Sequence, residues 1–450
     1  MTERKGFTNR LGFILAGAAA AVGIGALWRF PPLVAEHGGG AFLLVYLLLT
    51  FTLGFVLLIT EIAIGRKSGK SAILAYGSLN RKWQFLGVLA VLVSCIVIPY
   101  YSLIGGWVME YGALYLTNNQ ALALNPDFFQ NFIADPVLPV IWTMIFIAIT
   151  AAVLLFGVTK GIQRSSMIIL PFLILVMIGI SVYCILLPGG LDGLAFYFIP
   201  DFSHFSAAGF LEALGMALFS LCIASGCMIT YGSYLSKTEN IEKSAFHMIL
   251  FSAGATILAG LLIIPSFFSI SGGDMSSLQS GTGLLFTQMP MVFEMMPFGT
   301  VIGAIFFICV FFAALTSAIA TFEVPVAALI DRFKLSRPKA VGIVCAGTSI
   351  IAVIVSFGYG IWSNISIGNY HILEIMDNVS SNLIRPVVAI LSCIFIGWIV
   401  FGRISVISDE VECSSRFISK KFFTVITKFI APLCLVIIFC FMVIKTILLA

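Results

Sequence analysis

Long apolar segments recur along the whole chain of 450 residues. A helix needs about 20 apolar residues to cross the hydrocarbon core of a bilayer, and eleven segments of this kind can be placed. Only 10% of the residues are charged and 60% are hydrophobic, whereas a soluble domain carries about 25% charged residues. We therefore predict an all-α polytopic membrane protein in a lipid bilayer, which excludes a soluble enzyme. The predicted spans are 11–35, 41–65, 86–116, 137–157, 165–187, 210–235, 245–270, 298–330, 339–358, 372–401 and 422–448.

The lysines and arginines orient these spans. If the N-terminus is cytoplasmic, 20 of the 24 lie on the cytoplasmic side, and the outer segments 117–136, 188–209, 271–297 and 359–371 contain none. Cytoplasmic loops of membrane proteins carry this excess of positive charge. An odd number of spans then places the C-terminus outside. The net charge of +4 forms no basic patch, so no nucleic-acid partner is expected.

Two spans contain residues that a membrane helix tolerates poorly. The first holds Gly23 and Gly25 near its middle, and the sixth holds the small residues of 220–226 at a similar depth. Unwound backbone survives inside a membrane only where it lines a cavity or binds a ligand. Breaks at matched positions of two halves favour a binding site between repeats, although small residues that pack helices together are the alternative.

Several motifs along the chain carry a family resemblance. They are GFILA at 12–16, AVGIG at 21–25, WRFP at 28–31, EHGGGAF at 36–42, EIAIGR at 61–66, Tyr100-Tyr101, ITYGSY at 229–234, LTS at 315–317, and Asp377 with Ser381-Asn382. In this order they resemble the sodium:neurotransmitter symporter family, in particular its bacterial, leucine-transporter-like branch with eleven helices.

The resemblance implies a leucine-transporter fold, in which two inverted repeats of five helices are followed by one extra helix. Residues 1–235 would hold the first repeat, which ends at 187, together with span six. Residues 210–402 would form the second repeat, and 403–450 a cytoplasmic loop and span eleven.

The resemblance also implies a substrate site at the two breaks. The amides of Ile24 and Gly25 and the hydroxyl of Tyr101 would bind a carboxylate, as helix N-termini favour anions. Gly23 stands where amine transporters of the family carry an Asp, which favours an amino acid, and small residues in the pocket favour an apolar or aromatic side chain. The remaining predicted substrate contacts are Ala21, Val97, Phe219, Ser220, Cys222, Ser225, Ser317 and Thr321.

At least one sodium ion is expected, because carbonyl and hydroxyl oxygens are the ligands that hard cations prefer. The resemblance implies a second sodium site with five ligands, which are Ala19, Val22, Ala313, Thr316 and Ser317. The first site would retain Ala21 and Ser220, but Ala26 and Ser252 stand where the family has Asn. Either sodium binds there with fewer ligands or the protein couples to one sodium ion. For chloride, Tyr46, Ser220 and Thr256 are present and Met216 replaces a Gln, so we infer chloride independence.

Ionisable residues inside spans are candidates for function. Arg29 and Asp377 resemble the outer gate pair of the family, and Arg4 and Asp331 the cytoplasmic pair. Arg385 lies where an apolar residue is expected, with Glu374 or a helix carbonyl as its candidate partner.

These observations predict a sodium-coupled amino-acid importer of the bacterial cytoplasmic membrane, monomeric or homodimeric, that works by alternating access. Two alternatives remain open: a proton-coupled or sodium-independent exchanger, and an amino-acid sensor that does not transport. No motif of catalytic residues indicates an enzyme.

Overall fold

The structure is a computed structural model that describes residues 6–279, 281–366, 370–399 and 405–449. Its regular elements over these residues are all helices, with one isolated antiparallel bridge between Gly39 and Pro200. This agrees with the predicted all-α class. The apolar sequence explains it, because a helix satisfies its backbone hydrogen bonds internally and can therefore cross lipid.

Nine helical stretches of the described residues are long and apolar enough to cross a membrane. They are α4–η1–α5 (Gly40–Ser68), η2–α7 (Arg81–Leu116), α9 (Leu138–Leu155), η4–α10 (Val158–Ile185), α14 (Ile241–Ser271), α16 (Gly299–Phe333), α17 (Arg337–Phe357), α18–η6–α19–η7 (Ile372–Ile399) and α21–η8–α22 (Lys420–Ile444 of a helix that continues to Leu449).

The other two predicted spans are interrupted. The first consists of α1 (Arg10–Ala21), α2 (Gly25–Trp28) and α3 (Phe30–Glu36), with a bend of 45° at the break. The sixth consists of α12 (Ala207–Ser220) and α13 (Cys227–Gly232). Each of the eleven predicted spans thus has a helical counterpart, and the interruptions fall where the sequence placed them.

Five of these stretches contain short turns that are not α-helical: η1, η4, η6, η7 and η8 are π-helical, and η2 is a 3₁₀ turn. Their parts are α4 (Gly40–Leu49), η1 (Thr50–Gly54), α5 (Phe55–Ser68), η2 (Arg81–Trp83), α7 (Gln84–Leu116), η4 (Val158–Gln163), α10 (Arg164–Ile185), α18 (Ile372–Asp377), η6 (Asn378–Ile384), α19 (Arg385–Ile394), η7 (Phe395–Ile399), α21 (Lys420–Val425), η8 (Ile426–Ile430) and α22 (Ala431–Leu449). Shorter elements connect the spans: α6 (Ala72–Leu79), η3 (Gln120–Leu122), α8 (Phe128–Ala134), α11 (Gly190–Phe198), η5 (Leu284–Gln288), α15 (Met289–Glu294) and α20 (Ser405–Glu412).

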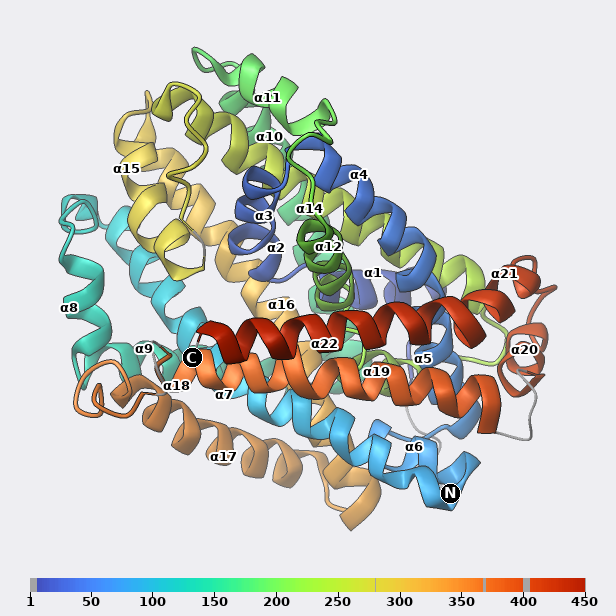
Figure 1. The fold of residues 1–450 in the computed structure, drawn as a ribbon. Helices are drawn as coiled ribbons and strands as arrows, with labels where there is room; N and C mark the ends of the chain where they lie inside the picture. Colours follow the sequence, from blue (N-terminus) through green and yellow to red (C-terminus); the bar gives the residue numbers. More distant parts are fainter. Residues whose placement is uncertain (1–5, 280, 367–369, 400–404, 450) are drawn as a thin grey trace.

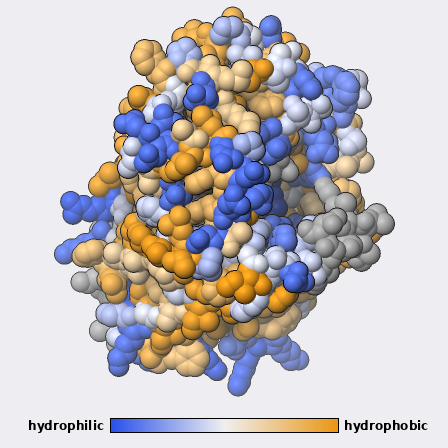
Figure 2. Space-filling model, turned by 90° about the vertical axis from the view of Figure 1, so that its left-hand side faces the viewer, coloured by the Kyte–Doolittle hydropathy of each residue, from blue (hydrophilic) through white to orange (hydrophobic). Residues whose placement is uncertain are grey.

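The interrupted helices lie in the middle of the bundle (Figure 1). Every residue from Gly12 to Ala21 in α1 is buried, as expected of a helix that is apolar on all sides. The helices α19 and α22 run side by side along one flank, and α8, α11 and α15 lie at the opposite end from α20 and α21. Hydrophilic and hydrophobic side chains share the face seen in Figure 2, where hydrophilic ones gather near the centre.

Glycines allow the second half of the broken sixth span to touch its neighbour. A Cβ atom at Gly65 of α5 would overlap the carbonyl of Ile229, and one at Gly232 of α13 would overlap the backbone of Ile62. The two backbones therefore pack directly against each other, as small residues permit in membrane helices. This contact fixes the position of α13, the part of the sixth span that follows the break.

Candidate functional site

The break in the first span is shaped by two glycines. A Cβ atom at Gly23 would lie 2.8 Å from the Tyr101 hydroxyl and 3.0 Å from Ser317 Oγ, and one at Gly25 would overlap the Phe219 ring. The amide of Ile24, between them, donates to Tyr101 Oη at 3.2 Å. Side chains of α7, α12 and α16 all contact this turn, and a side chain at Gly23 or Gly25 would collide with them. The glycines therefore do more than pack one helix against another.

The break in the sixth span contains left-handed backbone. Cys222, Ala224 and Gly226 have φ angles of 51°, 62° and 79°, and for the two residues with a side chain this conformation is costly. Three contacts from other spans hold it: Glu61 Oε1 accepts the Ala224 amide at 2.6 Å, Ser94 Oγ donates to the Ser225 carbonyl at 2.7 Å, and Cys222 Sγ contacts the Ala20 carbonyl at 3.2 Å.

A cavity of about 50 Å³ lies between the two breaks. We name it the central cavity, and its lining residues are Ala20, Ala21, Gly23, Gly25, Ala26, Trp28, Arg29, Val97, Tyr100, Tyr101, Phe219, Ser220, Cys222, Ser225, Ser317, Thr321, Asp377 and Arg385. Every predicted substrate contact is in this lining except Ile24, whose amide donates to the Tyr101 hydroxyl. The structure thus brings the predicted set together.

One hydroxyl predicted for the second sodium site, that of Ser317, lies at the first break. Ser317 Oγ donates to the Ala20 carbonyl at 3.0 Å, which joins α16 to the end of α1. Thr316 Oγ1 donates to the carbonyls of Phe312 and Ala313, at 3.0 and 3.2 Å. Ala19 and Val22 are buried in the same turn. The donor set is made of carbonyls and hydroxyls without a carboxylate, which fits a monovalent hard cation.

The residues predicted for the first sodium site and for chloride are also neighbours. Ser252 Oγ lies 3.5 Å from the Ser220 carbonyl, at the limit of a hydrogen bond. The Tyr46 hydroxyl donates to Ser220 Oγ at 3.1 Å and lies 3.3 Å from Thr256 Oγ1. Ala26 lines the central cavity without a side-chain oxygen. This position therefore offers fewer oxygens than the second sodium site.

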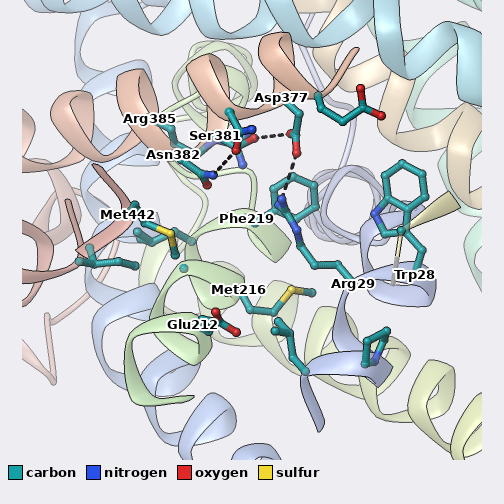
Figure 3. Close-up of a pocket in the computed structure, with 18 of the residues that line it drawn as sticks. Trp28, Arg29, Glu212, Met216, Phe219, Asp377, Ser381, Asn382, Arg385 and Met442 are labelled. Atoms are coloured by element: carbon teal, nitrogen blue, oxygen red, sulfur yellow. Dashed lines mark hydrogen bonds and ion pairs between the residues drawn. The ribbon is translucent and has the colours of Figure 1, made fainter. Parts of the chain in front are cut away.

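A charged pair closes one side of the central cavity. Arg29 Nη2 and Asp377 Oδ2 are 3.0 Å apart, and Tyr100 and Ser381 each donate to Asp377 Oδ1 at 2.9 Å. Beyond this pair lies a larger cavity of about 540 Å³, which we name the wide cavity (Figure 3). Its lining includes Trp28, Arg29, Glu36, Glu212, Met216, Phe219, Tyr370, Glu374, Asp377, Asn378, Ser381, Asn382, Arg385 and Met442.

The opposite side of the break is closed by a different set of charges. Glu323 is fully buried, accepts the Tyr234 hydroxyl at 2.6 Å and pairs with Arg337 Nη2 at 2.6 Å. Phe7 packs edge-on against Tyr234. The sequence did not predict the Glu323–Arg337 pair. Arg337 follows the turn after α16, and the number of residues between the two does not show that its side chain points back toward Glu323.

The predicted cytoplasmic pair is placed only in part. Arg4 lies outside the described residues. The carboxylate of Asp331 accepts the amide of Ser71 at 2.6 Å, which links the end of α16 to the start of α6. The pairing of Arg4 with Asp331 therefore stays a prediction.

The comparisons with known proteins agree with this architecture. The model of the sodium:neurotransmitter symporter family matches residues 4–128 and 129–449. The chain belongs to this family. As a family member, it has the transporter identity and the leucine-transporter fold that the sequence motifs predicted.

Individual relatives match this chain along nearly its entire length. An uncharacterized sodium-dependent transporter of Bacillus subtilis, YhdH, is 34% identical, with 98% of each chain covered. One of Haemophilus influenzae is 30% identical, covering 97% of this chain and 98% of the relative. The rat sodium- and chloride-dependent GABA transporter 2 is 25% identical over 91% of this chain and 75% of its own. These similarities make this symporter-family member a sodium-dependent multi-pass membrane transporter.

A solved structure supports the fold directly. The structure of MhsT in complex with L-phenylalanine superposes with a TM-score of 0.87 at 32% identity, covering 97% of this chain and 99% of that one. The helices of this symporter-family member, including both interrupted spans, therefore form a bundle already seen with an amino acid bound in a relative.

Proposed function

We propose that the protein imports an amino acid together with sodium by alternating access. The observation that carries the proposal is the hydrogen bond from Ser317 to the Ala20 carbonyl at the break of the first span. It places the Ser317 hydroxyl of α16 against the Ala20 carbonyl at the end of α1, so a cation held there would link two helices that must separate for release. Sodium would supply a positive charge that favours the conformation in which these helices are together.

For the substrate we propose a zwitterionic amino acid with an apolar or aromatic side chain. Gly23 supports this class, because Tyr101 and Ser317 leave no room there for an acidic side chain that would bind an amine. The lining by Val97, Phe219 and Thr321 supports an apolar side chain, and MhsT has been solved with L-phenylalanine. The partial positive charge of the α2 N-terminus would favour the carboxylate.

Two barriers would alternate around the site. The pair of Arg29 and Asp377 separates the central from the wide cavity, and we assign it to the outer gate. The Tyr234–Glu323–Arg337 network, with Phe7 beside it, would be part of the inner barrier. We place the protein in a bacterial cytoplasmic membrane, with its N-terminus in the cytoplasm and its C-terminus outside. The wide cavity then opens to the outer side. The first inverted repeat would end at 187, and the second would span 210–402.

Uptake into proteoliposomes tests this function. Purified protein is reconstituted and accumulation of radiolabelled phenylalanine, leucine and tryptophan is measured with an inward sodium gradient. Uptake should stop when choline replaces sodium. Uptake that is unchanged in choline contradicts sodium coupling.

A proton-coupled or sodium-independent exchanger is a second candidate, which the missing side-chain oxygen at Ala26 favours. Uptake driven by a pH gradient without sodium would support it. Binding without any flux would instead indicate a sensor.

A further inference from the structure

Arg385 is a buried cation with no ion pair to a carboxylate of the described residues. The residue is only 6% exposed, and its Nε and Nη1 atoms are buried with no hydrogen-bond partner. Placing an unpaired charge in a low-dielectric interior is costly, and intramembrane arginines are normally paired. The direct contacts of Arg385 with the described residues therefore leave two of its buried nitrogen atoms unsatisfied.

The nearby carboxylates are engaged elsewhere. Asp377 forms an ion pair with Arg29 and accepts hydrogen bonds from Tyr100 and Ser381. Glu374, which the sequence offered as a partner for Arg385, accepts instead from the Tyr359 hydroxyl at 2.6 Å.

Glu61 accepts the Ala224 amide through one oxygen, and its other oxygen is buried without a partner. No ion pair joins it to Arg385 among the residues that the structure places. The charges of Glu61 and Arg385 nevertheless interact without a direct contact. The test below therefore includes Glu61.

The guanidinium of Arg385 lies at the boundary between the two cavities and lines both of them. Its carbon is 5.1 Å from the centre of the Phe219 ring, and that of Arg29 is 4.9 Å from the same ring. Figure 3 shows Phe219 next to both arginines. A cation–π contact contributes about 0.5–2 kcal/mol, so the ring compensates only part of the cost of burial.

A line of polar side chains leads from the wide cavity to Arg385. Asn378, Ser381 and Asn382 precede it by three to seven residues on the same face of η6 and α19, and all of them line the wide cavity. Asn382 Nδ2 donates to Asn378 Oδ1 at 2.7 Å, and the same nitrogen carries a second N–H. Amide donors around a guanidinium form an environment for an anion.

We propose that Arg385 binds a compact monovalent anion that enters through the wide cavity. Two sources share this chemistry: a free chloride ion, or a carboxylate on the side chain of an acidic amino acid. The position differs from the place expected for the substrate α-carboxylate at Ile24 and Gly25, and from the chloride position at Tyr46 and Ser220. The carboxylate source rests on the proposed amino-acid transport and would replace the apolar or aromatic side chain of the proposed substrate by an acidic one, whereas the chloride source leaves that substrate unchanged.

The test is an equilibrium measurement that needs no transport. Purified protein in detergent is held in sodium gluconate at constant sodium, and its thermal unfolding midpoint is followed while chloride is titrated in. A parallel series adds aspartate or glutamate, with asparagine and glutamine as neutral matches. Either chloride or the acidic amino acids should raise the midpoint in a saturable way, and the series that responds identifies the source.

Two substitutions and a control assign the effect to Arg385. Arg385→Gln should weaken the apparent affinity for the anion at least about tenfold, equal to 1.4 kcal/mol, while Arg385→Lys, which keeps the charge, should lose less. Lys428→Gln removes another positive charge from a span; its ammonium lies over Trp398 and away from both cavities, so the affinity should stay unchanged.

Three results would overturn the proposal. The first is a wild-type midpoint that responds to neither anion. The second is an anion response that survives in Arg385→Gln. The third is a loss of stability in Arg385→Gln that is equal in chloride and gluconate and is reversed by Glu61→Gln, which would show that Arg385 only balances Glu61. Failure of sodium-driven uptake alone leaves the chloride result unaffected, so the two proposals can fail separately.

Discussion

Ser317 is the residue through which α16 contacts the unwound turn of the first span. Its hydroxyl bonds to Ala20 across nearly three hundred positions of sequence, whereas the neighbouring Thr316 hydroxyl bonds within its own helix. A hydroxyl in a membrane helix more often bonds to its own backbone. Ser317 is therefore the hydroxyl at which the proposed sodium site is best tested.

Ser317→Ala should therefore weaken sodium-dependent substrate binding. Removing one of five predicted oxygens should lower the apparent sodium affinity by about tenfold, or ~1.4 kcal/mol, as measured by scintillation proximity with a radiolabelled substrate. Ser266→Ala is the matched control, because Ser266 is buried in α14 and bonds only to carbonyls of its own turn. Wild-type sodium dependence in Ser317→Ala would contradict the site.

Residues of the site differ in how far sequence could predict them. Gly23, Tyr101 and Phe219 were placed by motif and converge on the central cavity. The Ala20 carbonyl was missed, because any residue carries a carbonyl and only the fold selects which one is freed. Arg385 was noticed as unusual, but its contact with Phe219 depends on side-chain direction, which spacing does not give.

At the scale of elements, the break between α12 and α13 is kept open by side chains of other spans. Its left-handed residues Cys222 and Ala224 would be unfavourable in isolation. Glu61 from α5 offsets this by accepting the Ala224 amide, and Ser94 from α7 by binding the Ser225 carbonyl. The sequence predicted where this helix breaks from its small residues, but not what anchors it, because the anchors lie more than a hundred residues away.

Glu61→Ala should destabilise this break. Without the carboxylate, the buried Ala224 amide loses its acceptor, at a cost of about 1–3 kcal/mol. Glu61→Gln keeps an acceptor oxygen and should restore most of the stability, as measured from the thermal unfolding midpoint in detergent. Equal midpoints for wild type and Glu61→Ala would show that the contact does not stabilise the break.

At the scale of the whole molecule, the sequence was sufficient to predict the helical spans of the bundle. Backbone groups in lipid must form their hydrogen bonds within the helix, so the length of each apolar segment indicates a span. It could not predict the relation of the cavities. That relation depends on Arg29 and Asp377, which are separated by more than three hundred residues yet form the wall between a 50 Å³ and a 540 Å³ space.

If this pair closes the wall, Asp377→Asn should open the central cavity to reagents from the wide cavity. Cys222 reports on this, because its thiol lines the central cavity. Modification of Cys222 by a small methanethiosulfonate should become several-fold faster in Asp377→Asn, and substrate should slow it. The rate is assigned by subtracting the reaction of Cys222→Ser, since other cysteines, such as Cys413, are exposed.

Glu374→Gln is the matched control for this labelling. Glu374 lies one turn before Asp377 and also lines the wide cavity, but its hydrogen-bond partner is Tyr359. Its neutralisation should leave the rate at Cys222 unchanged if the wall depends on the ion pair. A rate that rises equally in both variants would mean that net charge in the wide cavity controls access, because attraction of a charged reagent depends on the summed field. An uncharged reagent separates the two cases, since it responds to an opened wall and not to the field.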